Sequence, residues 1–165
     1  MIIVIAGTPG SGKTTIAREL SRLTGWRVIS LSHYIKEHDA LIGISRQTGT
    51  PVVDEKKIEN LLRIEIKKGG NIIIETHIPE VLPKEIIDFL FVLHVPVHVL
   101  LSRLKKRGWT QRKIDENIMA ELESRYVLEM PGAIHIYCDM RPPHEIAMDM
   151  FRIIKKTCQE SKTNF

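Results

Sequence analysis

The 165-residue sequence predicts a three-layer α/β domain, in which a parallel β-sheet is covered by helices on both faces. Two observations carry this prediction. Short apolar runs alternate with stretches of helical periodicity along the chain, and the first run leads directly into a glycine-rich loop that opens a helix. The length fits one domain, residues 1–165, which would bury about two thirds of the surface of its unfolded chain.

Five short apolar runs have the length and composition of strands. They lie at residues 2–5, 27–30, 71–75, 89–94 and 134–137. Because segments with helical periodicity separate these runs, we expect the strands to be parallel.

The helices are predicted from apolar residues that recur three and four positions apart. In the first helix Ile16, Ala17, Leu20 and Leu23 form such a stripe, which is expected to face the core. Residues typical of helix ends mark three further helices: Asp54 and Gly69-Gly70, Pro96 and Gly108, and Pro142-Pro143 before the last one.

Two segments depart from this alternation. Residues 38–51 are polar and contain Gly43, Gly49 and Pro51, so we expect a long excursion that serves as a lid or a binding loop. Residues 159–165 are polar and are expected to fray.

Composition and charge exclude several classes of protein. The opening apolar run has no basic segment before it and ends at Gly7, so we interpret it as a buried strand rather than a signal peptide. No run is long enough to span a membrane, and Cys138 and Cys158 match no metal-binding spacing and indicate no disulfide framework. We therefore expect a cytoplasmic protein. The net charge of +4 and the sequence pI of 9.1 favour polyanionic ligands such as nucleotides, RNA or acidic protein tails.

The most informative motif is the segment GTPGSGKT at residues 7–14, between the first predicted strand and the first predicted helix. Its two glycines, lysine and hydroxyl have the spacing of a phosphate-binding loop, which predicts the fold class of the P-loop NTPases. Phosphate is expected to contact the backbone amides at the positive end of the helix, those of Gly10, Ser11, Gly12, Lys13 and Thr14. Lys13 would reach the β and γ phosphates of ATP, and Thr14 would hold Mg²⁺. The alternative is a glycine-rich turn without a ligand.

A second feature is the pair Arg103 and Arg107, which lie four positions apart and so share one helix face. Two guanidinium groups can clamp a transferring phosphoryl group, because their planar forks bind phosphate oxygens and neutralise developing charge. A solvated basic face is the alternative. Trp109 either anchors the loop that follows or stacks on a base.

A third feature is a carboxylate at the end of an apolar strand. Glu75 closes the run at residues 71–75, and His77 lies on the same side if the strand continues. In P-loop folds an acid at this position can hold Mg²⁺ directly or through water, although a glutamate can also be an ordinary polar strand end. The other histidines form no metal-binding cluster: His33, His38, His94, His98, His135 and His144.

Beyond the P-loop, the chain resembles the atypical adenylate kinases of the isoenzyme 6 type, which occur in archaea and in eukaryotic nuclei. The similarity covers nearly the whole chain. It is carried by residues 7–15 (GTPGSGKTT), 51–55 (PVVDE), 69–77 (GGNIIIETH), 89–93 (FLFVL), 103–109 (RLKKRGW) and 113–121 (KIDENIMAE).

This resemblance implies a nucleoside monophosphate kinase fold with a five-stranded parallel sheet of order 2-3-1-4-5. It implies reversible transfer of a phosphoryl group from ATP to AMP or a related nucleoside monophosphate, with Mg²⁺ and a side ATPase activity. It also implies a role in maturation of the small ribosomal subunit and its 16S rRNA, through transient contact with a platform ribosomal protein. The ATP-binding residues would be Gly10, Ser11, Gly12, Lys13, Thr14 and Thr15, with Arg107 contacting ATP from a lid.

In the same family comparison, the monophosphate-binding segment would run from about residue 30 to 53 and the lid from about residue 106 to 116. Ser32, His33 and His77 are the candidate monophosphate ligands. Here the chain departs from the family pattern. Glu75 stands where the family has aspartate, and Ser32-His33 stand where it has Gly-Asp, so metal geometry and monophosphate affinity are expected to differ.

Two alternatives to a monophosphate kinase remain open at the level of the sequence. One is an assembly ATPase whose nucleotide cycle changes how tightly it binds a ribosomal partner, and whose kinase turnover is incidental. The other is a P-loop kinase for a different small acceptor, such as a nucleoside or shikimate.

Overall fold

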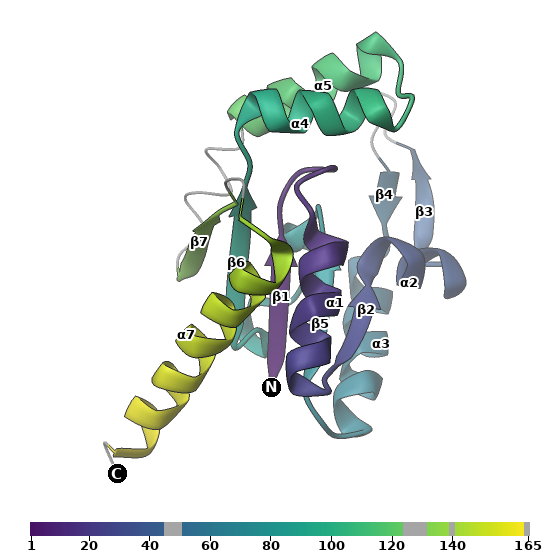
Figure 1. Cartoon of the computed structure of the whole chain (residues 1–165). Helices are drawn as coiled ribbons and strands as arrows, with labels where there is room; N and C mark the ends of the chain where they lie inside the picture. The colour runs from purple at the N-terminus through teal and green to yellow at the C-terminus, as the bar shows by residue number, and fades with distance from the viewer. Residues whose placement is uncertain (45–50, 124–131, 139–140, 164–165) are drawn as a thin grey trace.

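The computed structural model describes residues 1–44, 51–123, 132–138 and 141–163 (Figure 1). Its main element is a sheet of five parallel strands. In spatial order they are β2 (Arg27–Ser30), β5 (Ile72–Thr76), β1 (Ile2–Ala6), β6 (Phe89–His94) and β7 (Ala133–Tyr137). Counted along the chain within this sheet alone, the order is 2-3-1-4-5. The predicted α/β fold class with a parallel sheet is confirmed.

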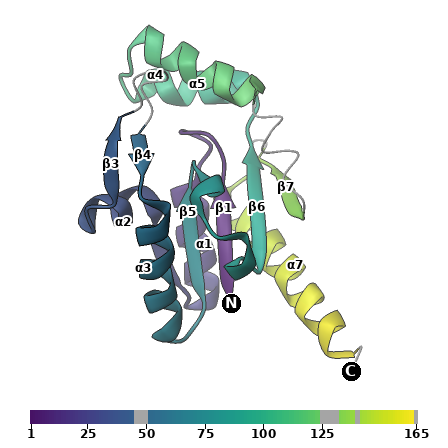
Figure 2. The same ribbon diagram turned by 180° about the vertical axis from the view of Figure 1, so that it is seen from behind.

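Helices cover both faces of this sheet and complete the three layers (Figures 1 and 2). They are α1 (Lys13–Thr24) and α7 (Pro143–Thr163) on one face, and α2 (Leu31–Glu37) and α3 (Glu55–Lys67) on the other. The central strand β1 is buried along its length, and its side chains alternate between the two cores. Ile3 and Ile5 pack on the α1 and α7 side, whereas Ile2 and Val4 pack on the α2 and α3 side.

A helical hairpin crosses above the carboxyl ends of the strands (Figures 1 and 2). It consists of α4 (Val97–Lys106) and α5 (Gln111–Glu123), and the predicted lid at residues 106–116 covers the end of α4, the turn at residues 107–110 and the first half of α5. Leu100 and Leu104 of α4 and Ile114 of α5 are buried in the core that also holds α1 and α7. Trp109 packs against the same core, and the Lys113 ammonium lies 4.2 Å from the centroid of its ring. Trp109 therefore anchors the turn.

The capping predictions hold at α3, where the side chain of Asp54 accepts a hydrogen bond of 2.9 Å from the Lys57 amide. Pro96, predicted to mark the start of a helix, is the N-cap of α4. Two short 3-10 turns that the sequence did not predict, Pro79–Val81 and Lys84–Ile86, connect β5 to β6.

The long excursion predicted at residues 38–51 does lie between α2 and α3 but is not wholly irregular, and the expected fraying is wrong for residues 159–163. The excursion at residues 38–51 contains an antiparallel pair, β3 (Leu41–Ile44) with β4 (Pro51–Val53); residues 45–50 lie outside the described part. Residues 159–163 do not fray but continue α7, supported by an ion pair of 4.0 Å between Lys156 and Glu160 one turn apart. Within the part of the chain that the structure describes, no helix is long and apolar enough to cross a membrane.

Candidate active site

The candidate site begins at the loop that joins β1 to α1. Three of its glycines have positive φ: 148° at Gly7, 94° at Gly10 and 103° at Gly12. A Cβ at Gly7 would lie 2.9 Å from the Leu93 carbonyl oxygen, and a Cβ at Gly10 would lie 2.8 Å from Leu100 Cδ1. Space and backbone conformation therefore both require glycine at these two positions. The loop therefore packs closely against β6 at Gly7 and against α4 at Gly10.

The loop presents an anion site at the positive end of α1. Gly12 is the N-cap of this helix, no described side chain caps it, and its first turn holds no acidic residue. Helix amides and the helix dipole together favour a bound phosphate at such an end. The Ser11 amide is already used, since it donates to the Thr8 carbonyl oxygen at 3.1 Å. The Ser11 hydroxyl is buried and has no hydrogen-bond partner among the described residues, so it could donate to a phosphate oxygen.

Lys13 is folded back over the loop. Its ammonium donates to the carbonyl oxygens of Gly7, at 2.7 Å, and Thr8, at 2.8 Å. Burial lowers the pKa of Lys13 from 10.5 to about 8; the carboxylate of Glu75 opposes this shift and the charge of Arg107 adds to it. A phosphate that replaced the two carbonyl oxygens would stabilise the charged ammonium.

Glu75 and His77 lie beside the loop because of the strand register. In the sheet Glu75 is paired with Ile5 of β1 on one side and with Ser30 of β2 on the other, so its carboxylate lies at the same edge as the loop. Glu75 is buried and His77 is exposed. The pKa of His77 is lowered, by partial desolvation first and by the charge of Lys13 second. Neutral imidazole is therefore favoured at this point.

These residues surround an open cavity of about 640 Å³, which we call the β5-side cavity. Its lining comprises Pro9, Gly10, Gly12, Lys13, Thr14, Thr15, Glu75, His77 and Arg107. The Thr14 hydroxyl and the Glu75 carboxylate supply hard oxygen ligands, and no cluster of three or more His, Cys, Asp or Glu side chains occurs among the described residues. Such a sparse oxygen set fits Mg²⁺, which is usually held by one or two protein oxygens together with substrate phosphates and water.

The two candidate monophosphate ligands on α2 lie in different places. Ser32 approaches the β5-side cavity, with its hydroxyl oxygen 3.4 Å from Nδ1 of His77. His33 lies apart from this group: its side chain is 72% exposed and pairs with Glu37 at 3.4 Å. The structure therefore brings Ser32 and His77 together and leaves His33 on the outer surface.

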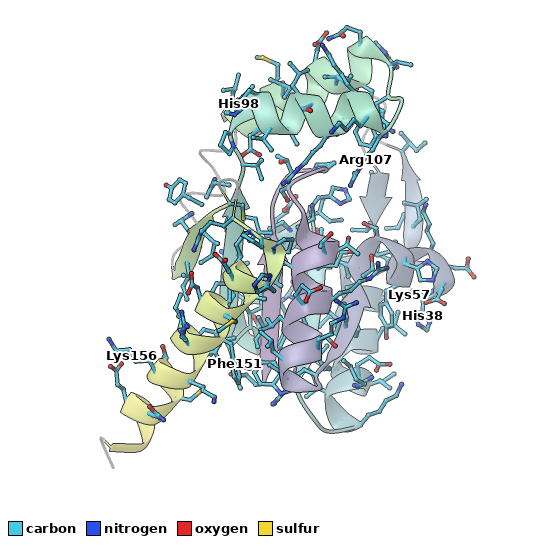
Figure 3. The ribbon with its side chains drawn as sticks, viewed as in Figure 1. His38, Lys57, His98, Arg107, Phe151 and Lys156 are labelled. Atoms are coloured by element: carbon cyan, nitrogen blue, oxygen red, sulfur yellow. The ribbon has the colours of Figure 1, made fainter. Side chains whose placement is uncertain are left out.

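The two arginines of the predicted clamp both reach the loop, from α4. Nη1 of Arg103 donates to the carbonyl oxygens of Gly10, at 3.2 Å, and Ser11, at 3.3 Å. Arg107 is exposed, and its side chain lies between the helical hairpin and the loop (Figure 3). In this conformation Arg103 supports the loop, and Arg107 is the guanidinium left to face a ligand.

A second open cavity, of about 630 Å³, lies on the other side of the loop; we call it the α7-side cavity. The loop residues 10–12, Thr15 and Ile16 form one wall, and Arg103 and Arg107 form the roof. The far wall comes from Cys138 and Arg141, which lie between β7 and α7, and from Pro143 and Ile146 of α7. Gly10, Gly12, Thr15 and Arg107 line both cavities. The loop therefore lies between the two cavities, and Arg107 contributes to the lining of both.

Two residues near the loop, Glu121 and Arg141, were not predicted from the sequence as site residues. The carboxylate of Glu121 on α5 accepts a hydrogen bond of 2.5 Å from the Thr8 hydroxyl, 113 positions away along the chain. Arg141 lines the α7-side cavity. A signal for Arg141 existed: it follows the fifth predicted strand and precedes Pro142-Pro143, so it had to lie at the same sheet edge as the P-loop.

Comparison with known proteins shows the family of this chain. A family profile described as "AAA domain" matches residues 3–123. A putative adenylate kinase of Sulfurisphaera tokodaii is 38% identical over 122 residues, which are 74% of this chain and 63% of that protein. An adenylate kinase isoenzyme 6 homolog of Schizosaccharomyces pombe is 37% identical over 120 residues, which are 73% of this chain and 68% of that protein. The chain belongs to the adenylate kinase isoenzyme 6 family.

Solved structures show the same fold with lower sequence similarity. A shikimate kinase from Acinetobacter baumannii, in complex with shikimate, superposes with a TM-score of 0.64 at 19% identity and covers 94% of this chain and 93% of its own. At this identity the match concerns the fold alone. The relatives in the isoenzyme 6 family are longer than the matched region, which spans less than two thirds of the Sulfurisphaera protein.

Proposed function

We propose that this chain is a nucleoside monophosphate kinase, which transfers the terminal phosphoryl group of ATP to AMP or a related monophosphate. The observation that carries the proposal is the position of the phosphate loop between two cavities, with Arg107 in the wall of both. A kinase of this class needs one nucleotide on each side of the group in transfer. Membership of the adenylate kinase isoenzyme 6 family supports the same reaction.

The donor ATP occupies the α7-side cavity with its phosphates along the loop. The amides of Gly12, Lys13 and Thr14 and the hydroxyl of Ser11 hold phosphate oxygens, and Thr15 lies in the walls of both cavities. Lys13 releases its two backbone carbonyl partners and binds the β and γ phosphates, which returns its pKa toward the ordinary lysine range. Arg103 keeps the loop in place through its carbonyl oxygens.

The acceptor monophosphate occupies the β5-side cavity, next to the segment at about residues 30–53. Ser32 and His77 are its proposed ligands, and Arg107 neutralises charge as the phosphoryl group passes between the two nucleotides. Thr14 and Glu75, the latter directly or through water, would hold Mg²⁺, which would supply charge neutralisation on the donor phosphates. Closure of the lid at about residues 106–116 excludes water from this site.

The proposal includes a side ATPase activity, which the same geometry supports. Arg107 and His77 are exposed to solvent in this conformation, so water can take the place of the acceptor when the hairpin stays open. The family resemblance extends the proposal to late maturation of the small ribosomal subunit, through transient contact with a platform ribosomal protein and rRNA. The net charge of +4 suits an RNA-rich partner.

The proposal is tested with an acceptor panel. Purified protein receives ATP, Mg²⁺ and one acceptor at a time: AMP, GMP, CMP, UMP, adenosine or shikimate. The proposal predicts rapid ADP formation with one or more monophosphates and only slow ATP hydrolysis without them. Preferential turnover of adenosine or shikimate would show a different small-molecule kinase. Hydrolysis that monophosphates leave unchanged, but that small ribosomal subunits stimulate, would favour the assembly ATPase.

A further inference from the structure

The positive charge of the chain is concentrated in the helical hairpin. Residues 97–114, which comprise α4, the turn and the first four residues of α5, contain six Lys and Arg and no Asp or Glu. The whole chain has 24 Lys and Arg against 20 Asp and Glu, so the residues outside this segment hold 18 cations and 20 anions. They carry a net charge of −2, and the hairpin therefore accounts for the whole positive charge of the chain.

The six cations fall into two groups. Arg103 supports the phosphate loop and Arg107 lines both cavities, so these two face the candidate active site. The other four are exposed and line neither cavity. We call them the hairpin cations: Lys105, Lys106, Arg112 and Lys113. They flank the turn, at the end of the hairpin farthest from the point where β6 leads into α4 (Figures 1 and 2).

Helix stability does not account for the two cations of α5. Arg112 and Lys113 lie in the first turn of this helix, which contains no acidic residue. The positive end of a helix dipole favours anions, so cations at this end are unfavourable for the helix itself. Arg112 pairs with Glu116 at 3.6 Å, but its side chain is 89% exposed, and such ion pairs contribute little. The cations and the helix dipole instead add to one positive potential at the turn, which attracts an anionic partner.

The surroundings of the hairpin cations suit phosphate groups better than a protein surface. Protein interfaces have an apolar centre from which charged residues are depleted. Over residues 98–118, all of which the structure describes, no large apolar side chain is exposed. Trp109 packs against the core and Lys113 lies over its ring, so it offers no open face on which a base could stack. Contacts at this surface are therefore ionic and reach phosphates rather than bases.

We propose that the hairpin cations are a binding surface for RNA, which they contact through its phosphate backbone and without preference for sequence. The inference rests on the proposed function, because it assigns a surface to the RNA contact named there. Since the hairpin cations lie outside both cavities, RNA and a nucleotide bind at the same time. Four phosphate contacts to a single strand give a plot of log association constant against log salt concentration a slope of about −3.

The test measures binding of short single-stranded RNA by fluorescence anisotropy over a range of salt concentrations, with ADP and Mg²⁺ present to occupy the phosphate loop. The wild type is compared with the triple variant Lys105→Gln, Lys106→Gln and Arg112→Gln, which keeps Lys113 over Trp109. We expect this variant to bind RNA at least about tenfold more weakly at low salt, and its salt slope to be about −1. Two RNAs of different sequence should bind the wild type equally within about threefold.

A second triple variant is the matched control, because it removes the same charge from exposed positions on α2 and α3: Lys36→Gln, Lys56→Gln and Lys67→Gln. It is expected to bind RNA like the wild type within about twofold, and circular dichroism checks that both variants are folded. A wild type that does not bind RNA, equal weakening in the two variants, or no weakening in the hairpin variant would each overturn the proposal.

The same assay separates RNA from an acidic protein partner and this surface from the kinase. Tighter binding of poly-glutamate than of RNA of the same charge would assign the surface to an acidic protein and overturn the proposal. A wild type that binds RNA through the hairpin cations but uses no monophosphate acceptor would refute the proposed reaction and support the RNA surface.

Discussion

The hydroxyl of Thr8 donates a hydrogen bond of 2.5 Å to Oε2 of Glu121, and so joins the phosphate loop to α5 of the helical hairpin. Its two partners come from positions 113 residues apart, and one of them is a carboxylate. Hydrogen bonds to charged groups contribute about 1.5–3 kcal/mol when both partners are in place. The position of the hairpin is therefore coupled to the loop that binds phosphate.

Removal of this bond should loosen the hairpin. In Thr8→Val we expect amide hydrogens of α5 to exchange about tenfold faster or more, while those of α3 keep their protection. Hydrogen exchange with mass spectrometry measures both helices in one sample. Ser102→Ala, at an exposed position on α4, serves as the control. Unchanged exchange in α5 of Thr8→Val would show that this bond does not hold the hairpin.

Alanine at Gly10 should destabilise the fold more than alanine at Gly25. Both glycines have positive φ, 94° and 73°, so both substitutions strain the backbone. Only at Gly10 does the new Cβ meet neighbours, at 2.8 Å from Leu100 and 3.1 Å from Leu104; at Gly25 nothing lies within 4 Å. We expect Gly10→Ala to lose about 1–3 kcal/mol more of unfolding free energy than Gly25→Ala. Urea unfolding measures the difference, and equal losses would contradict the close contact with α4.

The lowered pKa of Lys13 predicts a stability that rises with pH. Below about pH 8 the lysine is charged in both the folded and the unfolded chain, and the folded state bears the cost of burying that charge. Between about pH 8 and 10.5 the folded chain releases the proton while the unfolded chain still binds it, so the unfolding free energy increases.

The matched comparison for this pH dependence is Lys13→Met, which has no titrating group at that position. Relative to this variant, the wild type should gain up to about 3 kcal/mol between pH 7 and pH 10.5. Urea unfolding at several pH values measures the gain. Parallel pH profiles of the two proteins would show that Lys13 titrates at its ordinary value.

Arg107→Ala should reduce phosphoryl transfer much more than ATP binding. The exposed Arg107 lines both cavities, so its charge matters most while phosphate charge is redistributed between them. We expect kcat to fall about a hundredfold or more and the dissociation constant of ATP to change less than about threefold. Lys106→Ala, with an exposed cation next in sequence, is the control. Equal losses in binding and turnover would remove the transition-state role.

The sequence predicted the framework because its signals are local. The buried run at Ile72–Thr76 and the capping residue Asp54 each determine their element without distant partners. The P-loop is equally local, since residues 7–14 carry the whole motif. The β3–β4 pair was missed for the opposite reason: Leu41–Ile44 is short, contains Gly43 and leaves its apolar side chains largely exposed, so it lacks the pattern of a buried strand.

Local sequence signals also explain which part of the candidate site could be predicted. Glu75 could be placed near the loop because parallel strands end at one edge of the sheet. The contact between Thr8 and Glu121, and the anchoring of Arg141 by Asp149, depend on how distant segments pack, and no sequence spacing encodes them. The candidate role of His33 came from the family comparison alone. In the structure its side chain points outward and pairs with Glu37.

The fate of the γ-phosphoryl group of ATP tests the central claim most directly. Protein is mixed with Mg²⁺, AMP and ATP labelled in its γ phosphorus, and the products are separated during the first turnovers. The account predicts that the label appears as the β-phosphoryl group of ADP, at a rate that rises and saturates with AMP and far exceeds phosphate release. Label that appears only as inorganic phosphate, at a rate independent of AMP, would contradict it.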